Sequence, residues 1–286
     1  MKDLIREIIQ QLVVGNEVNW SDSLSERYFD EPLVNFASAD DPLFEQLKQI
    51  IGPWHRTPKE VFETFHGEGS WNGGTVISWV MPWSKGLRDS NRVCNERPSV
   101  EWTLAYYLGS KVLQKQVRTA LLGELTGYGH RGVAPADAEW FRIVDTSNGK
   151  SSTWSERHVG YVAGLGTFGL NNAFISEKGM AVVLNSVVTD AILPPDRRVA
   201  SHHQANCLFY AAGSCGACIK RCPAQAISHN GHDKNRCMMY AYGPESNRIA
   251  AERGVSGPAG CALCQVGVPC EVRNPTHYLE QHNNPI

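Results

Sequence analysis

The chain has 286 residues, a length that suits one main domain with a small second one. Hydrophobic residues make up 42% of it and charged residues 20%, which indicates a globular protein with a sizeable core. The net charge is −2 and the sequence contains no basic run. This composition argues against a protein that works mainly by binding phosphates, such as a nucleic-acid-binding module.

Residues 1–14 predict an amphipathic helix. Its apolar residues share one stripe: Leu4, Ile5, Ile8, Ile9 and Leu12. Charged residues interrupt the segment, which is not typical of a signal peptide. No apolar run approaches the length needed to span a bilayer, so we expect a cytoplasmic protein without membrane contact. Cysteines in that compartment are reduced and free to bind metal.

The next 190 or so residues, up to about residue 200, predict alternating helices and strands. Ser99 is a plausible N-cap of a long helix that begins at Val100. Apolar and β-branched runs predict four strands: Thr75–Met81, Arg131–Pro135, Trp140–Val144 and Met180–Val188. This pattern fits an α/β or α+β fold.

The cysteines are distributed very unevenly. Cys94 stands alone, and a buried small hydrophobe is a commoner role for such a cysteine than a reactive thiol. The other eight all lie between residues 207 and 270: Cys207, Cys215, Cys218, Cys222, Cys237, Cys261, Cys264 and Cys270. The change follows the Pro-rich stretch Leu193–Asp196 and predicts two domains, residues 1–200 and 201–286.

The first cysteine run, from Cys215 to Pro223, reads C-x2-C-x3-C-P. Bacterial ferredoxins carry C-x2-C-x2-C-x3-C-P, and the last cysteine of that run binds the second cluster of the pair. The position of the first ligand holds Ala212 here. Cys207 lies five residues upstream and can supply the missing thiolate from a longer loop.

The second cysteine run is displaced in the same way. Cys261 and Cys264 form a C-x2-C pair, Cys237 is its upstream ligand, and Cys270 follows after a longer gap. Exchange of the last cysteine of each run divides the eight into two sets for two [4Fe–4S] clusters. The first set is Cys207, Cys215, Cys218 and Cys270, and the second is Cys222, Cys237, Cys261 and Cys264.

Two other interpretations of these cysteines remain open. Tetrahedral zinc also uses C-x2-C pairs, although it does not need the C-x3-C-P element. Clusters can also serve only to hold a small domain together. An adjacent pair of clusters usually conducts electrons as well, so we expect electron transfer or reduction.

Four segments resemble the epoxyqueuosine reductases and, more distantly, the cobalamin-dependent reductive dehalogenases. They are Val144–Thr146, the glycine-rich Ala163–Asn172, Ser186–Asp196 and Arg236–Tyr240. The resemblance implies a nitroreductase-like α/β domain that binds cobalamin, followed by a ferredoxin-like domain with two [4Fe–4S] clusters. It also implies base-off cobalamin, and the sequence contains no D-x-H-x-x-G motif for a cobalt-binding histidine.

The resemblance implies cofactor contacts from Gly164, Gly166, Phe168, Gly169, Asn171, Asn172, Ser186, Thr189 and Tyr240. Glycines let a flat ring approach the backbone, and asparagine amides can pair with the amides of a corrin. The same glycine cluster could equally be a tight turn that packs a helix on a sheet. The cluster alone therefore does not identify a corrin site.

Reduction of a C–O bond needs a proton donor, and a buried carboxyl with a raised pKa can serve as one. The resemblance assigns this role to Asp145 in the Val144–Thr146 motif. A turn or capping aspartate is the commoner role for Asp in such a sequence. Glu156 and Tyr240 are lesser candidates.

Together these features predict a cobalamin-dependent iron–sulfur reductase. Electrons would come from reduced ferredoxin or flavodoxin, and the substrate would be epoxyqueuosine in tRNA or a small molecule. Two alternatives remain open: an iron–sulfur electron-transfer protein without substrate chemistry of its own, and a flavin-dependent reductase.

Overall fold

The computed structural model describes residues 1–277. Its centre is an antiparallel sheet of four strands in the order β1-β2-β8-β3. The strands are β1 (Leu33–Ser38), β2 (Thr75–Pro82), β8 (Val182–Thr189) and β3 (Gly132–Val133). A mixed α/β protein was expected, and the antiparallel pairing makes it the α+β kind.

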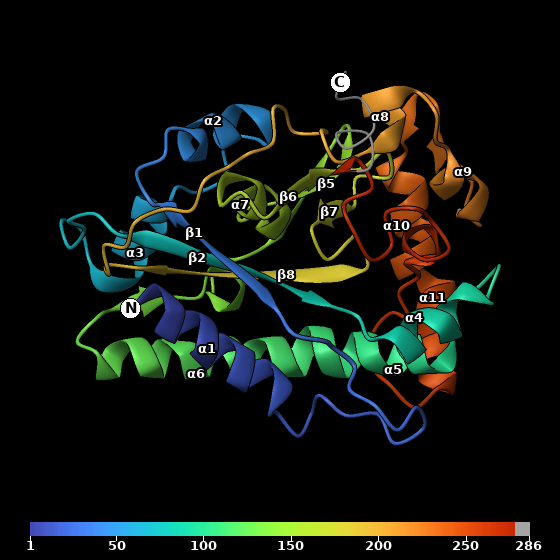
Figure 1. Cartoon of the computed structure of the whole chain (residues 1–286), viewed down its shortest axis with the longest axis horizontal. Helices are drawn as coiled ribbons and strands as arrows, with labels where there is room; N and C mark the ends of the chain where they lie inside the picture. The colour runs from blue at the N-terminus through green and yellow to red at the C-terminus, as the bar shows by residue number, and fades with distance from the viewer. Residues whose placement is uncertain (278–286) are drawn as a thin grey trace, which may run out of the picture.

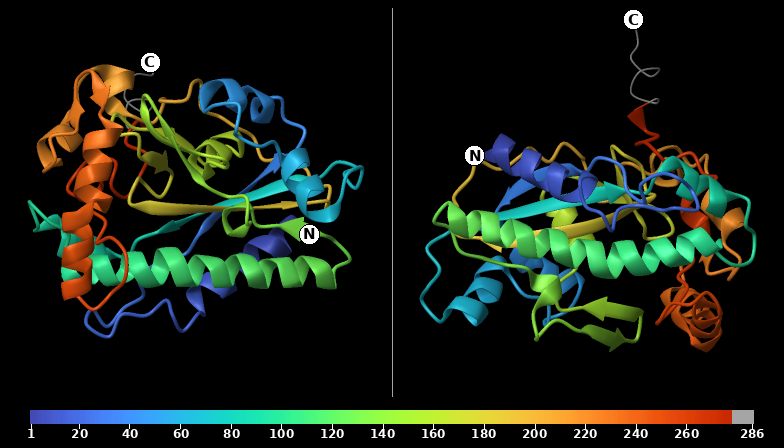
Figure 2. Two further views of the ribbon diagram at one scale, coloured as in Figure 1. Left: turned by 180° about the vertical axis from the view of Figure 1, so that it is seen from behind. Right: turned by 90° about the horizontal axis from the view of Figure 1, so that it is seen from below.

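Strand β2 is buried along its whole length because helices cover both faces of the sheet (Figures 1 and 2). Successive side chains of a strand point to opposite faces. Ile77, Trp79 and Met81 therefore pack in one core, and Val76 packs in the other. The first core lies under α1 (Lys2–Val14) and α6 (Gln114–Gly127), and the second under α2 (Leu43–Ile50), α3 (Pro58–His66) and α7 (Glu156–Val162).

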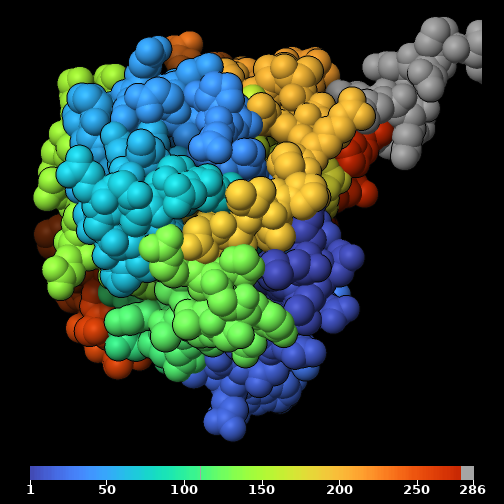
Figure 3. Space-filling model, turned by 90° about the vertical axis from the view of Figure 1, so that its left-hand side faces the viewer, coloured from blue at the N-terminus to red at the C-terminus, as the bar shows by residue number. Residues whose placement is uncertain are grey.

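The N-terminal helix lies as predicted, with a small correction. Ile5, Ile9 and Val13 are its buried residues, whereas Leu4 is 37% exposed. The buried face of the helix is therefore centred on Ile5, Ile9 and Val13 and does not include Leu4. The segment that follows β8 crosses the surface beside α1 (Figure 3), and Asp196 there accepts hydrogen bonds from Lys2 and Arg6.

The predicted long helix is continuous but changes its winding. It consists of α5 (Val100–Tyr107), a π-helical stretch (Leu108–Leu113) and α6. Ser99 caps it, since its side chain accepts a hydrogen bond from the backbone N–H of Trp102 at 3.0 Å. Helix α4 (Lys85–Arg92) precedes it and ends near the cysteine-rich segment.

Two of the predicted strands are shorter or shifted. The run Arg131–Pro135 contributes only β3, and a 3-10 turn (Pro135–Asp137) follows. The strand predicted over Trp140–Val144 begins at Ile143, because Trp140 packs instead beneath the guanidinium of Arg56 at 4.3 Å. Two hairpins complete this part: β4 (Ile143–Thr146) with β5 (Gly149–Ser152), and β6 (Gly166–Phe168) with β7 (Phe174–Ser176).

The cysteine-rich segment consists of short elements and lies at one end of the sheet (Figure 1). They are α8 (Leu208–Ala212), α9 (Ala217–Arg221), β9 (Ile227–Ser228), β10 (Gly231–His232), α10 (Lys234–Tyr242), α11 (Pro244–Glu252) and a 3-10 turn (Leu263–Gln265). The backbone N–H groups of Met180 and Ala181 donate to the carbonyls of Cys270 and Glu271 at 2.7 and 3.1 Å. These bonds join the segment to the start of β8.

Among the helices of residues 1–277, none combines the length and the hydropathy of a membrane-spanning segment.

Candidate functional site

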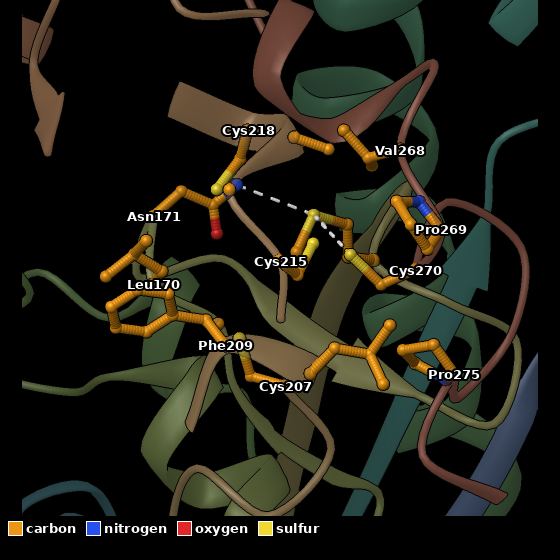
Figure 4. A pocket seen from close by; sticks show the side chains of 15 residues that line it. Leu170, Asn171, Cys207, Phe209, Cys215, Cys218, Val268, Pro269, Cys270 and Pro275 are labelled. Atoms are coloured by element: carbon orange, nitrogen blue, oxygen red, sulfur yellow. Dashed lines mark hydrogen bonds between the residues drawn. The ribbon is translucent and has the colours of Figure 1, made fainter. Parts of the chain in front are cut away.

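Four thiols from two distant stretches of the chain line one pocket (Figure 4): Cys207, Cys215, Cys218 and Cys270. Cys207 caps the short helix α8, and Cys218 lies within the short helix α9. Cys270 lies in a loop whose carbonyl at Cys270 accepts a hydrogen bond from the backbone N–H of Met180. Burial, together with the neighbouring sulfurs, raises the pKa of Cys218 to about 11 and that of Cys270 to about 12.

The other four thiols form a second group: Cys222, Cys237, Cys261 and Cys264. Burial raises the pKa of Cys261 to about 11, and the charges of Cys237 and Cys222 act in the same direction. The pKa of Cys264 lies well above its ordinary value for the same reasons. The Sγ atom of Cys222 accepts the backbone N–H of Ala226 at 3.3 Å.

The two groups have the membership that the exchange of last cysteines predicts. Sets of four thiolates are the usual ligands of [4Fe–4S] clusters, and N–H groups aimed at sulfur are typical surroundings of such clusters. The donor chemistry of each group therefore fits a cluster. Within residues 1–277, no three His, Cys, Asp or Glu side chains lie close enough together to hold a single metal ion. Ligation itself stays a prediction.

The glycines of the predicted cofactor segment lie in close contact with other residues of the chain. A Cβ atom on Gly166 would lie 2.2 Å from the carbonyl oxygen of Ile175, and one on Gly164 would lie 3.0 Å from that of Arg197. A Cβ atom on Gly169 would lie 2.9 Å from the side chain of Asn171. The space beside these glycines is therefore occupied by other segments of the chain, as expected if the glycines form a tight turn that packs a helix on a sheet.

The side chain of Asn171 points toward the thiols. Its amide Nδ2 lies 3.2 Å from the carbonyl oxygen of Cys264 and 3.4 Å from the Sγ atom of the same residue. The expectation that this amide faces a corrin is therefore not met. Asn172 lies nearby, with its Nδ2 3.4 Å from His232 Nδ1, and Phe168 packs edge-on against Phe174.

The remaining predicted cofactor residues also contact the protein itself. The Thr189 hydroxyl donates to the carbonyl of Arg131 at 2.8 Å, and the Tyr240 hydroxyl donates to the carbonyl of Glu96. The guanidinium of Arg97 covers the ring of Tyr240 at 4.1 Å. Ser186 is buried in the sheet. Six of the nine residues lie within the single segment Gly164–Asn172, whereas Ser186 and Thr189 belong to β8 and Tyr240 to α10.

Asp145 lies on the β4–β5 hairpin, outside the core. Its side chain is 81% exposed and forms an ion pair with Lys150 across the hairpin. The prediction that Asp145 is a buried carboxyl is wrong, because β4 pairs only with β5 and lies outside the central four-stranded sheet. Its role as a proton donor stays a prediction.

The enclosed carboxyl in this region belongs to Glu156, at the start of α7. Its Oε2 accepts a hydrogen bond from the Ser186 hydroxyl at 2.6 Å, and its Oε1 is buried without a partner among the described residues. Burial raises the pKa of Glu156 to about 7, although Ser186 and Arg118 lower it. Arg118 is held by two hydrogen bonds to Asp137, both 2.7 Å long. A carboxyl with this pKa can carry a proton at neutral pH.

Sequence reasoning did not single out His55. Its ring is fully buried, stacks 5.7 Å from the ring of Trp154 and accepts the backbone N–H of Ser155. Its Nδ1 has no partner among the described residues, and burial lowers its pKa to about 4. No motif surrounds His55 in the sequence, so only the packing of α7 against this loop reveals it.

Comparison with curated proteins gives three epoxyqueuosine reductases. The one from Synechocystis is 33% identical over 138 residues, the one from Aliivibrio fischeri 33% over 119, and the one from Bacillus anthracis 28% over 156. The chain is similar to epoxyqueuosine reductases. The family resemblance predicted from the motifs is therefore confirmed.

The similarity to these epoxyqueuosine reductases is partial. The matched segments cover 40–52% of this chain and 30–42% of the relatives. No family model matches the chain. Among solved structures, an epoxyqueuosine reductase from Bacillus subtilis aligns with a TM-score of 0.49 and 17% identity, over 94% of this chain and 65% of that one.

Proposed function

We propose that the chain is an oxidoreductase that carries two [4Fe–4S] clusters and passes electrons to a substrate. The observation that carries the proposal is the pocket lined by Cys207, Cys215, Cys218 and Cys270, four thiols from two distant stretches of the chain. The relatives' names support reduction as the activity. The proposed ligands are Cys207, Cys215, Cys218 and Cys270 for one cluster, and Cys222, Cys237, Cys261 and Cys264 for the other.

Cobalamin enters the proposal through the family resemblance alone. When bound base-off, it would supply a strongly reducing centre between the clusters and the substrate. The residues expected to contact it contact other parts of the protein instead, among them Asn171 and Thr189. These contacts give no support for a corrin site, so we derive no step through this group.

The proton needed for reduction would come from a carboxyl of this chain. Asp145 is the donor that the resemblance implies, and its hairpin would have to fold toward the core to reach a substrate. The β4–β5 hairpin forms a sheet of its own, and β5 is joined to the rest of the protein by α10 and by a hydrogen bond of 3.4 Å from the Ser151 hydroxyl to the carbonyl of Ile51. The exposed ion pair with Lys150 adds little, about 0–1 kcal/mol for such pairs.

The substrate and the electron donor complete the proposal. The relatives' name points to epoxyqueuosine as substrate, which we take in its tRNA-bound form, and a small molecule is the alternative. Reduced ferredoxin or flavodoxin would supply electrons.

The deciding experiment is iron and sulfide analysis of anaerobically prepared protein, where two clusters require about eight irons per chain. Zinc without iron would refute the proposal.

An iron–sulfur electron carrier without substrate chemistry is the second candidate. The scattered contacts of the predicted cofactor residues favour it. Turnover of an epoxide-bearing tRNA with a reduced flavodoxin would exclude it. Added cobalamin that co-elutes in gel filtration would support the reductase, and flavin released by heat would indicate a flavin enzyme instead.

A further inference from the structure

The side chain of Asn171 lies between the two thiol groups and is nearly fully buried, with 4% exposure. Its Oδ1 accepts the backbone N–H of Ala173 at 3.1 Å, which fixes the amide so that Nδ2 faces the sulfurs. Nδ2 then lies 3.2 Å from the carbonyl oxygen of Cys264, 3.4 Å from the Sγ atom of the same residue and 3.5 Å from Met180 Sδ. One amide thus contacts a thiol of the second group and a thioether.

Met180 extends this contact to the first group. Its Sδ lies 3.8 Å from Cys270 Sγ, and its backbone N–H donates to the carbonyl of Cys270 at 2.7 Å. Figure 4 shows the connection from Asn171 to Cys270 as dashed lines. A continuous chain of contacts therefore runs from Cys264 through Asn171 and Met180 to Cys270.

The turn around Asn171 holds its amide in place. The backbone N–H of Gly169 donates to the carbonyl of Ala173 at 2.8 Å, and that of Asn172 donates to the carbonyl of Gly169 at 2.9 Å. These backbone hydrogen bonds hold the turn, and with it the amide, in this orientation. The N–H need not be reoriented when a neighbouring sulfur gains charge.

A cluster becomes more negative when it is reduced, and its cysteine sulfurs carry part of that charge. An N–H group donated to such a sulfur stabilises the reduced form and raises the reduction potential. We propose that Asn171 is a positioning residue that raises the potential of the cluster held by Cys222, Cys237, Cys261 and Cys264. The inference rests on the proposed function, since it requires that cluster.

The test uses the full-length protein, reconstituted anaerobically with iron and sulfide. Asn171→Asp keeps the oxygen that accepts from Ala173 and replaces the N–H donor by a second oxygen, whereas Asn171→Leu removes both at similar volume. Met180→Leu is the matched control, because it keeps the packing and the N–H bond to Cys264. The readouts are iron per chain and a redox titration followed by electron paramagnetic resonance.

We expect full iron content in both Asn171 variants and a lower midpoint potential for the cluster held by Cys222, Cys237, Cys261 and Cys264. The other cluster, and both clusters of Met180→Leu, should keep their potentials. Unchanged potentials at full iron content would refute the role of Asn171, and so would loss of iron from both Asn171 variants, since it would mark a structural role. A wild-type protein that takes up no iron would instead refute the proposed function itself.

Discussion

The hydroxyl of Ser186 donates a hydrogen bond of 2.6 Å to the carboxyl of Glu156 and accepts one of 2.9 Å from the indole N–H of Trp154. Ser186 belongs to β8, and the other two residues lie at or before the start of α7. The three side chains thus join a helix to the sheet through polar contacts inside the core. The second carboxyl oxygen of Glu156 has no partner within residues 1–277, so a neutral carboxyl suits the site better than a charged one.

This relationship predicts a pH-dependent stability. The pKa of Glu156 is raised from 4.5 to about 7, so the folded protein holds a proton that the unfolded chain releases above pH 4.5. The free energy of unfolding should therefore fall as the pH rises from about 4.5 to 7, by at most about 3 kcal/mol from this group. Glu156→Gln should remove this contribution.

Urea unfolding at pH 5 and at pH 8 measures it. The wild type should lose more stability between the two pH values than Glu156→Gln does, and Asp145→Asn should behave like the wild type. Equal losses in wild type and Glu156→Gln would contradict the prediction.

Asp145 and Glu156 can be separated by activity. If the β4–β5 hairpin delivers the proton donor, Asp145→Asn should lower the turnover number by about 10²- to 10⁴-fold, the usual contribution of general acid catalysis. Iron content should stay unchanged because Asp145 lies on an exposed hairpin. A single-turnover assay with chemically reduced protein measures this step. Full activity of Asp145→Asn together with loss of activity in Glu156→Gln would move the role to Glu156.

The division of the thiols predicts how iron is lost. Cys215→Ser removes a ligand of the first group, and Cys261→Ser removes one of the second. Each variant should retain about half of the eight irons, with one cluster signal remaining. Cys94→Ser is the control and should retain all of the iron. If Cys215→Ser and Cys270→Ser affected different clusters, the proposed sets would be wrong.

The glycine at position 166 can be tested by stability alone. A Cβ atom there would meet the carbonyl oxygen of Ile175 at 2.2 Å, so Gly166→Ala should destabilise the protein by roughly 1 to 3 kcal/mol. Gly123→Ala is the matched control, because its Cβ would meet no atom within 4 Å on helix α6. It should stabilise by about 0.5 to 1 kcal/mol. Thermal unfolding of metal-free protein distinguishes the two, and an unaffected Gly166→Ala would favour the cofactor interpretation.

The local features could be predicted from the sequence because short-range chemistry dictates them. The buried strand β2 follows from its β-branched run, the cap at Ser99 follows from its residue type, and the grouping of thiols follows from cysteine spacing. The mixed α/β class followed from the alternation of elements. The exposure of Leu4 could not be predicted, because it depends on which face of α1 packs on the sheet.

The candidate site could be predicted only where motifs surround it. Glu156 is buried by contact with β8, which lies about 30 residues further along the chain. Asp145 is exposed because of where its hairpin lies in the fold, which the local sequence does not reveal. The contact between Asn171 and Cys264 joins segments far apart in sequence. A glycine-rich turn beside an asparagine gives no sign of which partner the asparagine will meet.

The backbone bonds from Met180 and Ala181 to Cys270 and Glu271 have a consequence for maturation. These bonds hold the loop that carries Cys270 beside the start of β8, where Cys270 joins the other thiols of its group. The sheet should therefore assemble before iron is inserted, and hydrogen exchange of freshly made apoprotein should already show protected amides in β2 and β8. Clusters would then be inserted into a chain whose central sheet is already formed.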